Sequence, residues 1–201
     1  MIINYLKNIF LPVPEEQAKC FRETLASENL VRLVIGGAAL SAVELGVFIT
    51  SINMEIGINN YPLAVILFNC LMIPLVVLLR RRPGGRQVKR AAVYGAVAFY
   101  LVWSCLFTWS TRSVMSASAP VLPLSVYMLM VYGIAVFIFL EPVWSAVFFA
   151  VSFILFMALA PFHRFVPREM MAILWNAVAL NVFAWITSRL ILGFRLRSFL
   201  D

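Results

Sequence analysis

The sequence predicts an all-α integral membrane protein with six transmembrane helices and both termini in the cytoplasm. Two features of the composition point to a membrane: 63% of the 201 residues are hydrophobic and only 12% are charged. A water-soluble domain carries about 25% charged residues, so most of this chain needs the bilayer as its solvent. The third feature is the placement of the charges, which separates the apolar stretches and sets their orientation.

Apolar stretches of about 20 residues, the length that crosses a bilayer as a helix, recur within residues 31–192. Pro74 lies inside the second stretch and should kink it, whereas Pro142 stands at the first turn of the fifth, where a proline fits well. Gly37 and Ser41 are small residues four apart, a spacing that lets another helix come close. The expected spans are 31–52, 62–79, 91–110, 121–140, 143–160 and 172–192.

Two shorter segments flank the six spans. Residues 1–30 predict a cytoplasmic or interfacial helical segment: an amphipathic helix in the headgroup layer, which Pro12 and Pro14 end, and then a polar helix of mixed charge over 15–30. Residues 193–201 are basic and helical in character. They predict the start of a cytoplasmic connector helix that leaves the membrane without a break.

The distribution of Lys and Arg decides the orientation. Thirteen of these residues lie in the N-terminal segment, in the loop after the second span and at the C-terminal end, against three on the opposite side. Because short cytoplasmic loops collect Lys and Arg, this bias places both termini in the cytoplasm. The same placement accounts for the net charge of +7, so we expect membrane lipid and no nucleic acid as a partner.

No pattern typical of catalysis occurs in the sequence. HExxH, GxSxG and a phosphate-binding Gly-rich loop are missing, and the one histidine, His163, cannot supply the paired ligands of a membrane haem. Cys20, Cys70 and Cys105 form no CxxC pair. We therefore expect no catalytic residue, no metal and no cofactor in this chain.

Polar side chains inside the spans are the candidates for a ligand site. Glu44 is the one acidic residue deep in a predicted span, where a charge is costly unless it is paired, neutralised or hydrated. It is either a protonated packing residue or the contact for a ligand, a cation or a proton in a cavity. The side chains that could join it are Asn69, Tyr127, Asn176 and Asn181.

Helical geometry limits what these side chains can do together. Asn176 and Asn181 are five residues apart, so they point about 140° away from each other and do not form a site by themselves. Hydrogen bonding between helices is the simpler role for each. The five tryptophans suit packing and the membrane interface. An aromatic cage for a small apolar or cationic ligand is the alternative.

The segments that enter the first span and leave the last span resemble those of a known class of membrane module. A polar helix leads through Glu28-Asn29-Leu30-Val31-Arg32 into the first span, and the last span leaves through Ser188-Arg189 and Arg195-Leu196-Arg197. With six spans between them, this order resembles the N-terminal membrane modules of bacterial signalling enzymes, most of all membrane-bound diguanylate cyclases with a GGDEF output domain. Class III adenylate cyclases and sensor histidine kinases carry similar modules.

The resemblance implies a sensor and anchor in the bacterial inner membrane, which passes a ligand or membrane signal through the sixth helix to a cytoplasmic domain. It implies a homodimer through that helix and its extension, with Arg189, Arg195 and Arg197 coupling the signal. These 201 residues lack the GGDEF signature itself, so alone they would not make cyclic-di-GMP.

Two other functions stay open at this point. A complete small six-span protein, such as a transporter subunit or a membrane assembly factor, would need a polar path lined by residues such as Glu44, Asn69 and Asn176. The scarcity of charge inside the spans argues against ion-coupled transport. An intramembrane enzyme acting on lipid or peptide would need catalytic pairs that the sequence does not contain.

Overall fold

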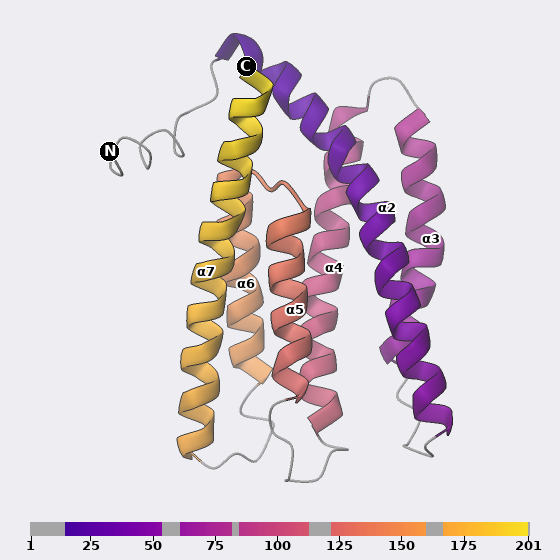
Figure 1. Cartoon of the computed structure of the whole chain (residues 1–201), viewed down its shortest axis with the longest axis vertical. Helices are drawn as coiled ribbons and strands as arrows, with labels where there is room; N and C mark the ends of the chain where they lie inside the picture. Colours follow the sequence, from indigo (N-terminus) through magenta and orange to yellow (C-terminus); the bar gives the residue numbers. More distant parts are fainter. Residues whose placement is uncertain (1–14, 54–60, 82–84, 113–121, 160–166, 201) are drawn as a thin grey trace.

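All regular structure in the described part of the chain is helical. The computed structural model describes residues 15–53, 61–81, 85–112, 122–159 and 167–200. The helices run side by side along the long axis of the molecule (Figure 1), which confirms the predicted all-helical fold. They are α2 (Glu15–Asn53), α3 (Tyr61–Arg81), α4 (Arg86–Arg112), α5 (Leu122–Phe137), α6 (Pro142–Leu159) and α7 (Pro167–Leu200).

Five of the described helices, α2, α3, α4, α6 and α7, are long and apolar enough to cross a membrane. The sixth, α5, has an apolar stretch of Val126–Phe137 within the described residues, which is shorter than a full span. It lies between α4 and α7 and packs against both (Figure 1). The described part of the chain therefore offers five or six membrane-crossing helices, in line with a multi-pass membrane protein.

The first helix joins two segments that the sequence predicts separately. The expected polar helix over 15–30 and the expected first span over 31–52 form one uninterrupted helix, α2. No proline and no glycine occurs between residues 15 and 35, so nothing in the local sequence breaks the helix. Near residue 30 the sequence changes from polar to apolar, but the helical backbone continues unchanged. The amphipathic helix predicted before Pro12 lies outside the described residues.

The predicted roles of two prolines can be compared with the structure. α3 continues on both sides of Pro74, and the kink expected there stays a prediction. α6 begins at Pro142, as expected for a proline in a first turn. Before α4, Gly85 has a φ of 72°, a left-handed conformation that favours glycine, and its carbonyl accepts the first helical bond of α4 from Lys89 at 2.9 Å.

α4 is the central helix of the bundle. In its most apolar stretch, 56% of the residues are buried, compared with 22% in the corresponding stretches of α3 and α6. It packs against α2 and α3 on one side and against α5 and α6 on the other, while α7 packs against α5 and α6. The outer helices leave large apolar side chains such as Leu71 and Val143 exposed. Exposed apolar surface of this extent indicates contact with lipid.

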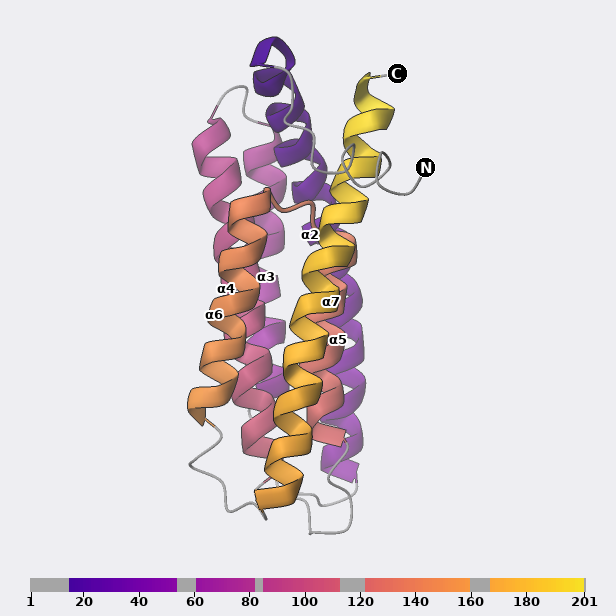
Figure 2. The ribbon, with the colours of Figure 1, turned by 90° about the vertical axis from the view of Figure 1, so that its left-hand side faces the viewer.

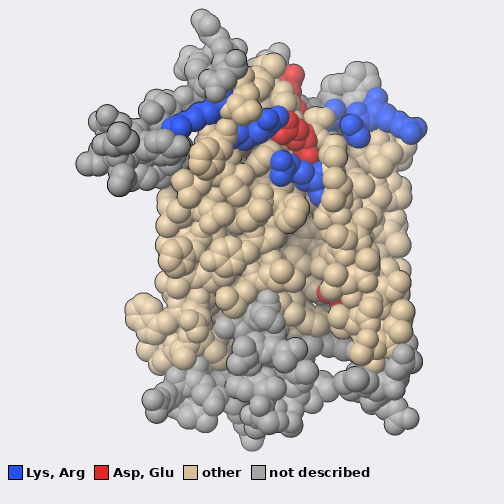
Figure 3. All heavy atoms as spheres, viewed as in Figure 1, with Lys and Arg blue, Asp and Glu red and all other residues tan. Residues whose placement is uncertain are grey.

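The start of α2 and the end of α7 lie at the same end of the bundle (Figures 1 and 2). The end of α3 and the start of α4 lie there too, and Figure 3 shows the Lys and Arg side chains of this face gathered there. We call this the basic end. Its described cationic residues are Arg22, Arg32, Arg80, Arg81, Lys89, Arg90, Arg195 and Arg197.

Candidate functional site

The residues predicted as ligand candidates are divided among several places in the structure. Asn69 belongs to one buried hydrogen-bonded cluster, and Tyr127 and Asn181 belong to another. Asn176 is exposed on α7, and Glu44 is buried on α2. No hydrogen bond between described residues joins the two clusters, so they do not form one polar path in this part of the chain.

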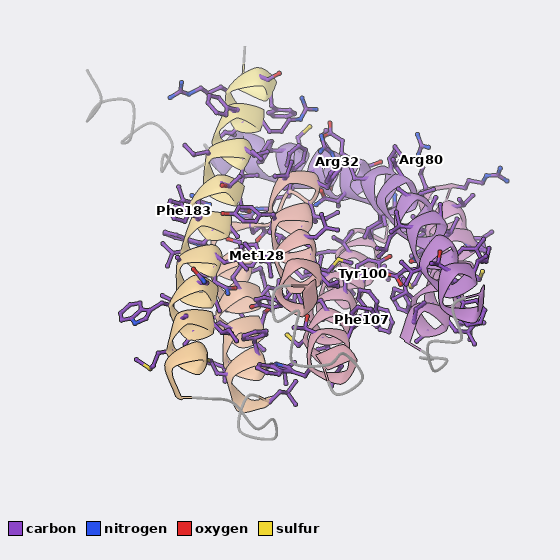
Figure 4. The ribbon with its side chains drawn as sticks, turned by 60° about the horizontal axis from the view of Figure 1, so that its bottom comes forward. Arg32, Arg80, Tyr100, Phe107, Met128 and Phe183 are labelled. Atoms are coloured by element: carbon purple, nitrogen blue, oxygen red, sulfur yellow. The ribbon has the colours of Figure 1, made fainter. Side chains whose placement is uncertain are left out.

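The first cluster, which we call the Asn69 cluster, consists of Asn69, Gly37, Ser41 and Tyr100. The Asn69 amide nitrogen donates to the Gly37 carbonyl at 3.0 Å and to the Ser41 hydroxyl at 2.8 Å. The Tyr100 hydroxyl donates to the Asn69 amide oxygen. Tyr100 reaches this cluster from α4 (Figure 4). Both amide hydrogens and the amide oxygen are thus used, and the cluster ties α2, α3 and α4 together.

Gly37 makes this close approach possible. A Cβ atom at this position would lie 3.1 Å from the Asn69 amide oxygen and 3.2 Å from the Tyr100 hydroxyl, with Gly37 itself buried. A Cβ here would require the amide or the hydroxyl to move by a few tenths of an ångström, and a larger side chain would displace them further. The predicted pair of small residues, Gly37 and Ser41, therefore acts within the bundle.

The second cluster, which we call the Tyr127 cluster, consists of Tyr127, Ser152 and Asn181 from α5, α6 and α7. The Asn181 amide nitrogen donates to the Tyr127 hydroxyl at 3.0 Å and to the Ala177 carbonyl at 2.8 Å. The Tyr127 and Ser152 hydroxyls are 3.0 Å apart. The Tyr127 ring stacks on Phe156, with ring centroids 4.5 Å apart. Asn181 is buried and Asn176 is exposed, so the two side chains point in different directions, as their spacing predicts.

Glu44 is the buried acidic group of the membrane region. It is 5% exposed, and no described group hydrogen-bonds its Oε2 atom. It lies three residues after Ser41 on α2, so it is close to the Asn69 cluster in sequence without a hydrogen bond to it. A carboxyl group at this depth is neutral, hydrated or in contact with a ligand. Both of its predicted roles, packing and ligand contact, remain open to test.

The residues predicted to couple the signal lie along the second half of α7. Arg195 forms a two-point ion pair with Glu28 of α2: its Nε donates to Oε2 at 3.0 Å, and its Nη2 donates to Oε1. One turn further on, Phe199 meets Phe21 edge to face, with ring centroids 5.2 Å apart. We call these four residues the α2–α7 clasp. Arg189 is buried on α7.

An apolar cluster supports the clasp. Phe21 and Leu25 of α2 pack with Leu192 of α7 and with Phe139 from the link between α5 and α6. All four side chains are buried, although they lie at the basic end of the bundle. The end of α7 is thus held by apolar burial as well as by charge.

α2 also holds the corner between α5 and α6, which we define as residues 137–141. The Asn29 amide nitrogen donates to the Phe139 carbonyl at 2.8 Å, and the Phe139 N–H donates to the Asn29 amide oxygen at 2.9 Å. Arg32 donates to the Phe137 carbonyl at 3.2 Å and lies 3.9 Å over the Phe139 ring. These side chains satisfy backbone groups that the end of α5 leaves without helical partners. Figure 4 shows Arg32 beside the end of α5.

A second ion pair fixes the same corner to α4. Arg90 donates to Glu141 at 2.9 Å, and the Arg90 guanidinium lies 5.1 Å from the Tyr94 ring centroid. Sequence reasoning missed Glu28, Asn29 and Glu141 as site residues. Their partners are 51 to 167 residues away in the chain, and no local pattern reveals such a pairing.

No protein-family model, curated protein or solved structure matches this chain. The site is therefore defined by its own geometry. In the membrane region that geometry consists of two closed, neutral hydrogen-bonded clusters. At the basic end, α2 contacts α7 through the Glu28–Arg195 ion pair and the α5–α6 corner through neutral Asn29 hydrogen bonds, and α4 contacts the same corner through Arg90–Glu141.

Proposed function

We propose that this chain is a membrane sensor and anchor module whose last helix, α7, passes a signal to a C-terminal cytoplasmic output domain. The output that we favour is a diguanylate cyclase that makes cyclic-di-GMP. The stimulus is a small apolar or cationic ligand, or a change in the state of the membrane. The observation that carries this proposal is the α2–α7 clasp, which holds the end of a helix that also packs inside the bundle.

The form of α7 suits the transfer of a displacement. Its 34 residues form one helix from Pro167 to Leu200, which is about 50 Å long at about 1.5 Å per residue. A continuous helix carries a rotation or shift at one end to the other. Asn181 connects α7 to α5 and α6 through the Tyr127 cluster, while Arg195 connects it to α2. A change in the packing of the spans would therefore reach the basic end through α7.

The orientation and oligomeric state follow from the same proposal. In the bacterial inner membrane, the basic end would face the cytoplasm because it collects the Lys and Arg side chains. A cyclase output would need a homodimer, because its two half-sites meet across a two-fold axis. Phe183 and Phe194 are exposed on α7 and lie 11 residues apart, close to three turns. They offer one face of α7 for contact with a second copy.

The native gene product tests the proposal. An immunoblot with an antibody against the N-terminal segment, in the organism that carries the gene, gives the mass of the whole protein. We expect a mass above 22.7 kDa by the weight of a further domain, roughly 100–200 residues. Deletion of the gene should then lower cellular cyclic-di-GMP. A product of 22.7 kDa would contradict the proposal and favour a transporter subunit or an assembly factor.

A further inference from the structure

A groove lies between α2 and α3 at the basic end of the bundle. Its volume is about 450 Å³, within the range of about 300–1,000 Å³ that is usual for ligand pockets. α2 and α3 are direct neighbours in the bundle. The lining residues are Leu30, Val31, Val34 and Ile35 of α2 with Val76, Val77, Arg80 and Arg81 of α3.

The groove combines two kinds of surface. Six of its eight lining residues are aliphatic, and they come from helix segments that belong to apolar spans. Arg80 and Arg81 stand at one end of it, in the last turn of α3, and both are exposed. Among the described residues neither forms an ion pair. Figure 4 shows Arg80 at the end of its helix, directed away from the bundle.

This arrangement matches an amphiphile with an anionic head. Guanidinium groups bind phosphate oxygens through charged hydrogen bonds, and basic pockets between membrane helices recognise acidic lipid headgroups. A free phosphate ion would leave the aliphatic wall without a partner. We propose that the groove binds one anionic phospholipid, with an acyl chain between α2 and α3 and its phosphate against Arg80 and Arg81.

Native mass spectrometry of the full chain tests this site. The protein is released from detergent after incubation with phosphatidylglycerol or with phosphatidylcholine of the same acyl chains. We expect one retained phosphatidylglycerol and weaker retention of phosphatidylcholine. Replacing Arg80 and Arg81 together with glutamine should lower the retention of phosphatidylglycerol about tenfold, because each cation near an acidic headgroup contributes to binding.

A matched variant separates the site from the charge of the surface. Arg22 and Lys89 also lie at the basic end but do not line the groove, so changing both to glutamine removes the same charge. We expect this control to keep the wild-type retention. An equal loss in both double variants would overturn the proposal, because general surface charge would then explain the binding. No preference for phosphatidylglycerol in the wild type would overturn it as well.

A second pair of variants tests the apolar part without changing charge. Val77→Trp fills the groove, whereas Leu78→Trp introduces the same side chain at an exposed position that does not line it. We expect only Val77→Trp to lower lipid retention, with helicity by circular dichroism unchanged in both. Equal retention in the two variants, or displacement of the lipid by inorganic phosphate alone, would contradict an acyl chain in the groove.

Discussion

The membrane region and the basic end hold their helices together by different means. In the membrane region, the Asn69 and Tyr127 clusters are neutral, buried and made of short hydrogen bonds between neighbouring helices. At the basic end, Glu28–Arg195 and Arg90–Glu141 are charged and partly exposed. Neutral buried bonds fix one packing arrangement, whereas partly exposed ion pairs exchange with water at little cost. The difference indicates that the adjustable contacts of α7 lie at the basic end.

The largest effect should come from Gly37→Leu. The new side chain would meet the Asn69 amide and the Tyr100 hydroxyl at once, so we expect a loss of about 2–3 kcal/mol in the free energy of unfolding. Unfolding in mixed micelles by sodium dodecyl sulfate measures it. Gly46→Leu is the control, because a Cβ at Gly46 has nothing within 4 Å. Equal losses in the two variants would show that α2 and α3 do not approach as described.

Asn181→Leu should have the next largest effect. It leaves the buried Tyr127 hydroxyl without its amide partner, and interhelical hydrogen bonds of this kind are worth about 1–2 kcal/mol at most. Asn176→Leu is the matched control on the same helix, because Asn176 is exposed and should lose almost nothing. Comparable destabilisation by both substitutions in the same micelle assay would refute the Tyr127 cluster.

The Glu28–Arg195 ion pair of the clasp should contribute less to the free energy of unfolding. A double-mutant cycle with Glu28→Gln and Arg195→Gln should give a coupling of about 0.5–1 kcal/mol, because both side chains are about one-third exposed. The coupling should fall in high salt, which screens exposed charges. Under the proposed sensor function, either single variant should alter cellular cyclic-di-GMP in the native organism more than it alters protein abundance. A coupling of zero at low salt would show that the Glu28–Arg195 ion pair does not stabilise the contact between α2 and α7.

Glu44→Gln should change stability least. Glutamine has nearly the same shape as a neutral glutamic acid, and the Oε2 atom makes no hydrogen bond to a described group that could be lost. Under the proposed sensor function, we expect unchanged expression and a changed response to stimulus, measured as cyclic-di-GMP in the native organism. If the response is also unchanged, Glu44 serves packing alone.

The sequence predicts the long apolar helices and the divergence of neighbouring side chains, because both depend on local rules. Apolar length marks α3, α4, α6 and α7, and the period of the helix correctly places Asn176 and Asn181 on different faces of α7. The close approach at Gly37 also follows from local spacing. These features need no knowledge of which helices are neighbours.

The order of the helices around the bundle could not be predicted, and the contents of each polar cluster depend on it. From the sequence alone, Glu44, Asn69 and Tyr127 are equally plausible partners of one another. In the structure Asn69 pairs with Tyr100 of α4, and Tyr127 pairs with Ser152 of α6. The clasp joins Glu28 to Arg195 across 167 residues. Such pairs are set by tertiary packing, and a single sequence carries no local sign of them.

Hydrogen exchange of the full chain in lipid nanodiscs, at low salt and at about 1 M salt, most directly tests the difference between the membrane region and the basic end. At high salt the Debye length falls to about 3 Å, which weakens the Glu28–Arg195 ion pair of the α2–α7 clasp and leaves neutral buried bonds unchanged. We predict faster exchange in the last two turns of α7 and near Glu28, with no change around Asn69 and Asn181. The same salt response in both regions, or none near Arg195, would contradict the account.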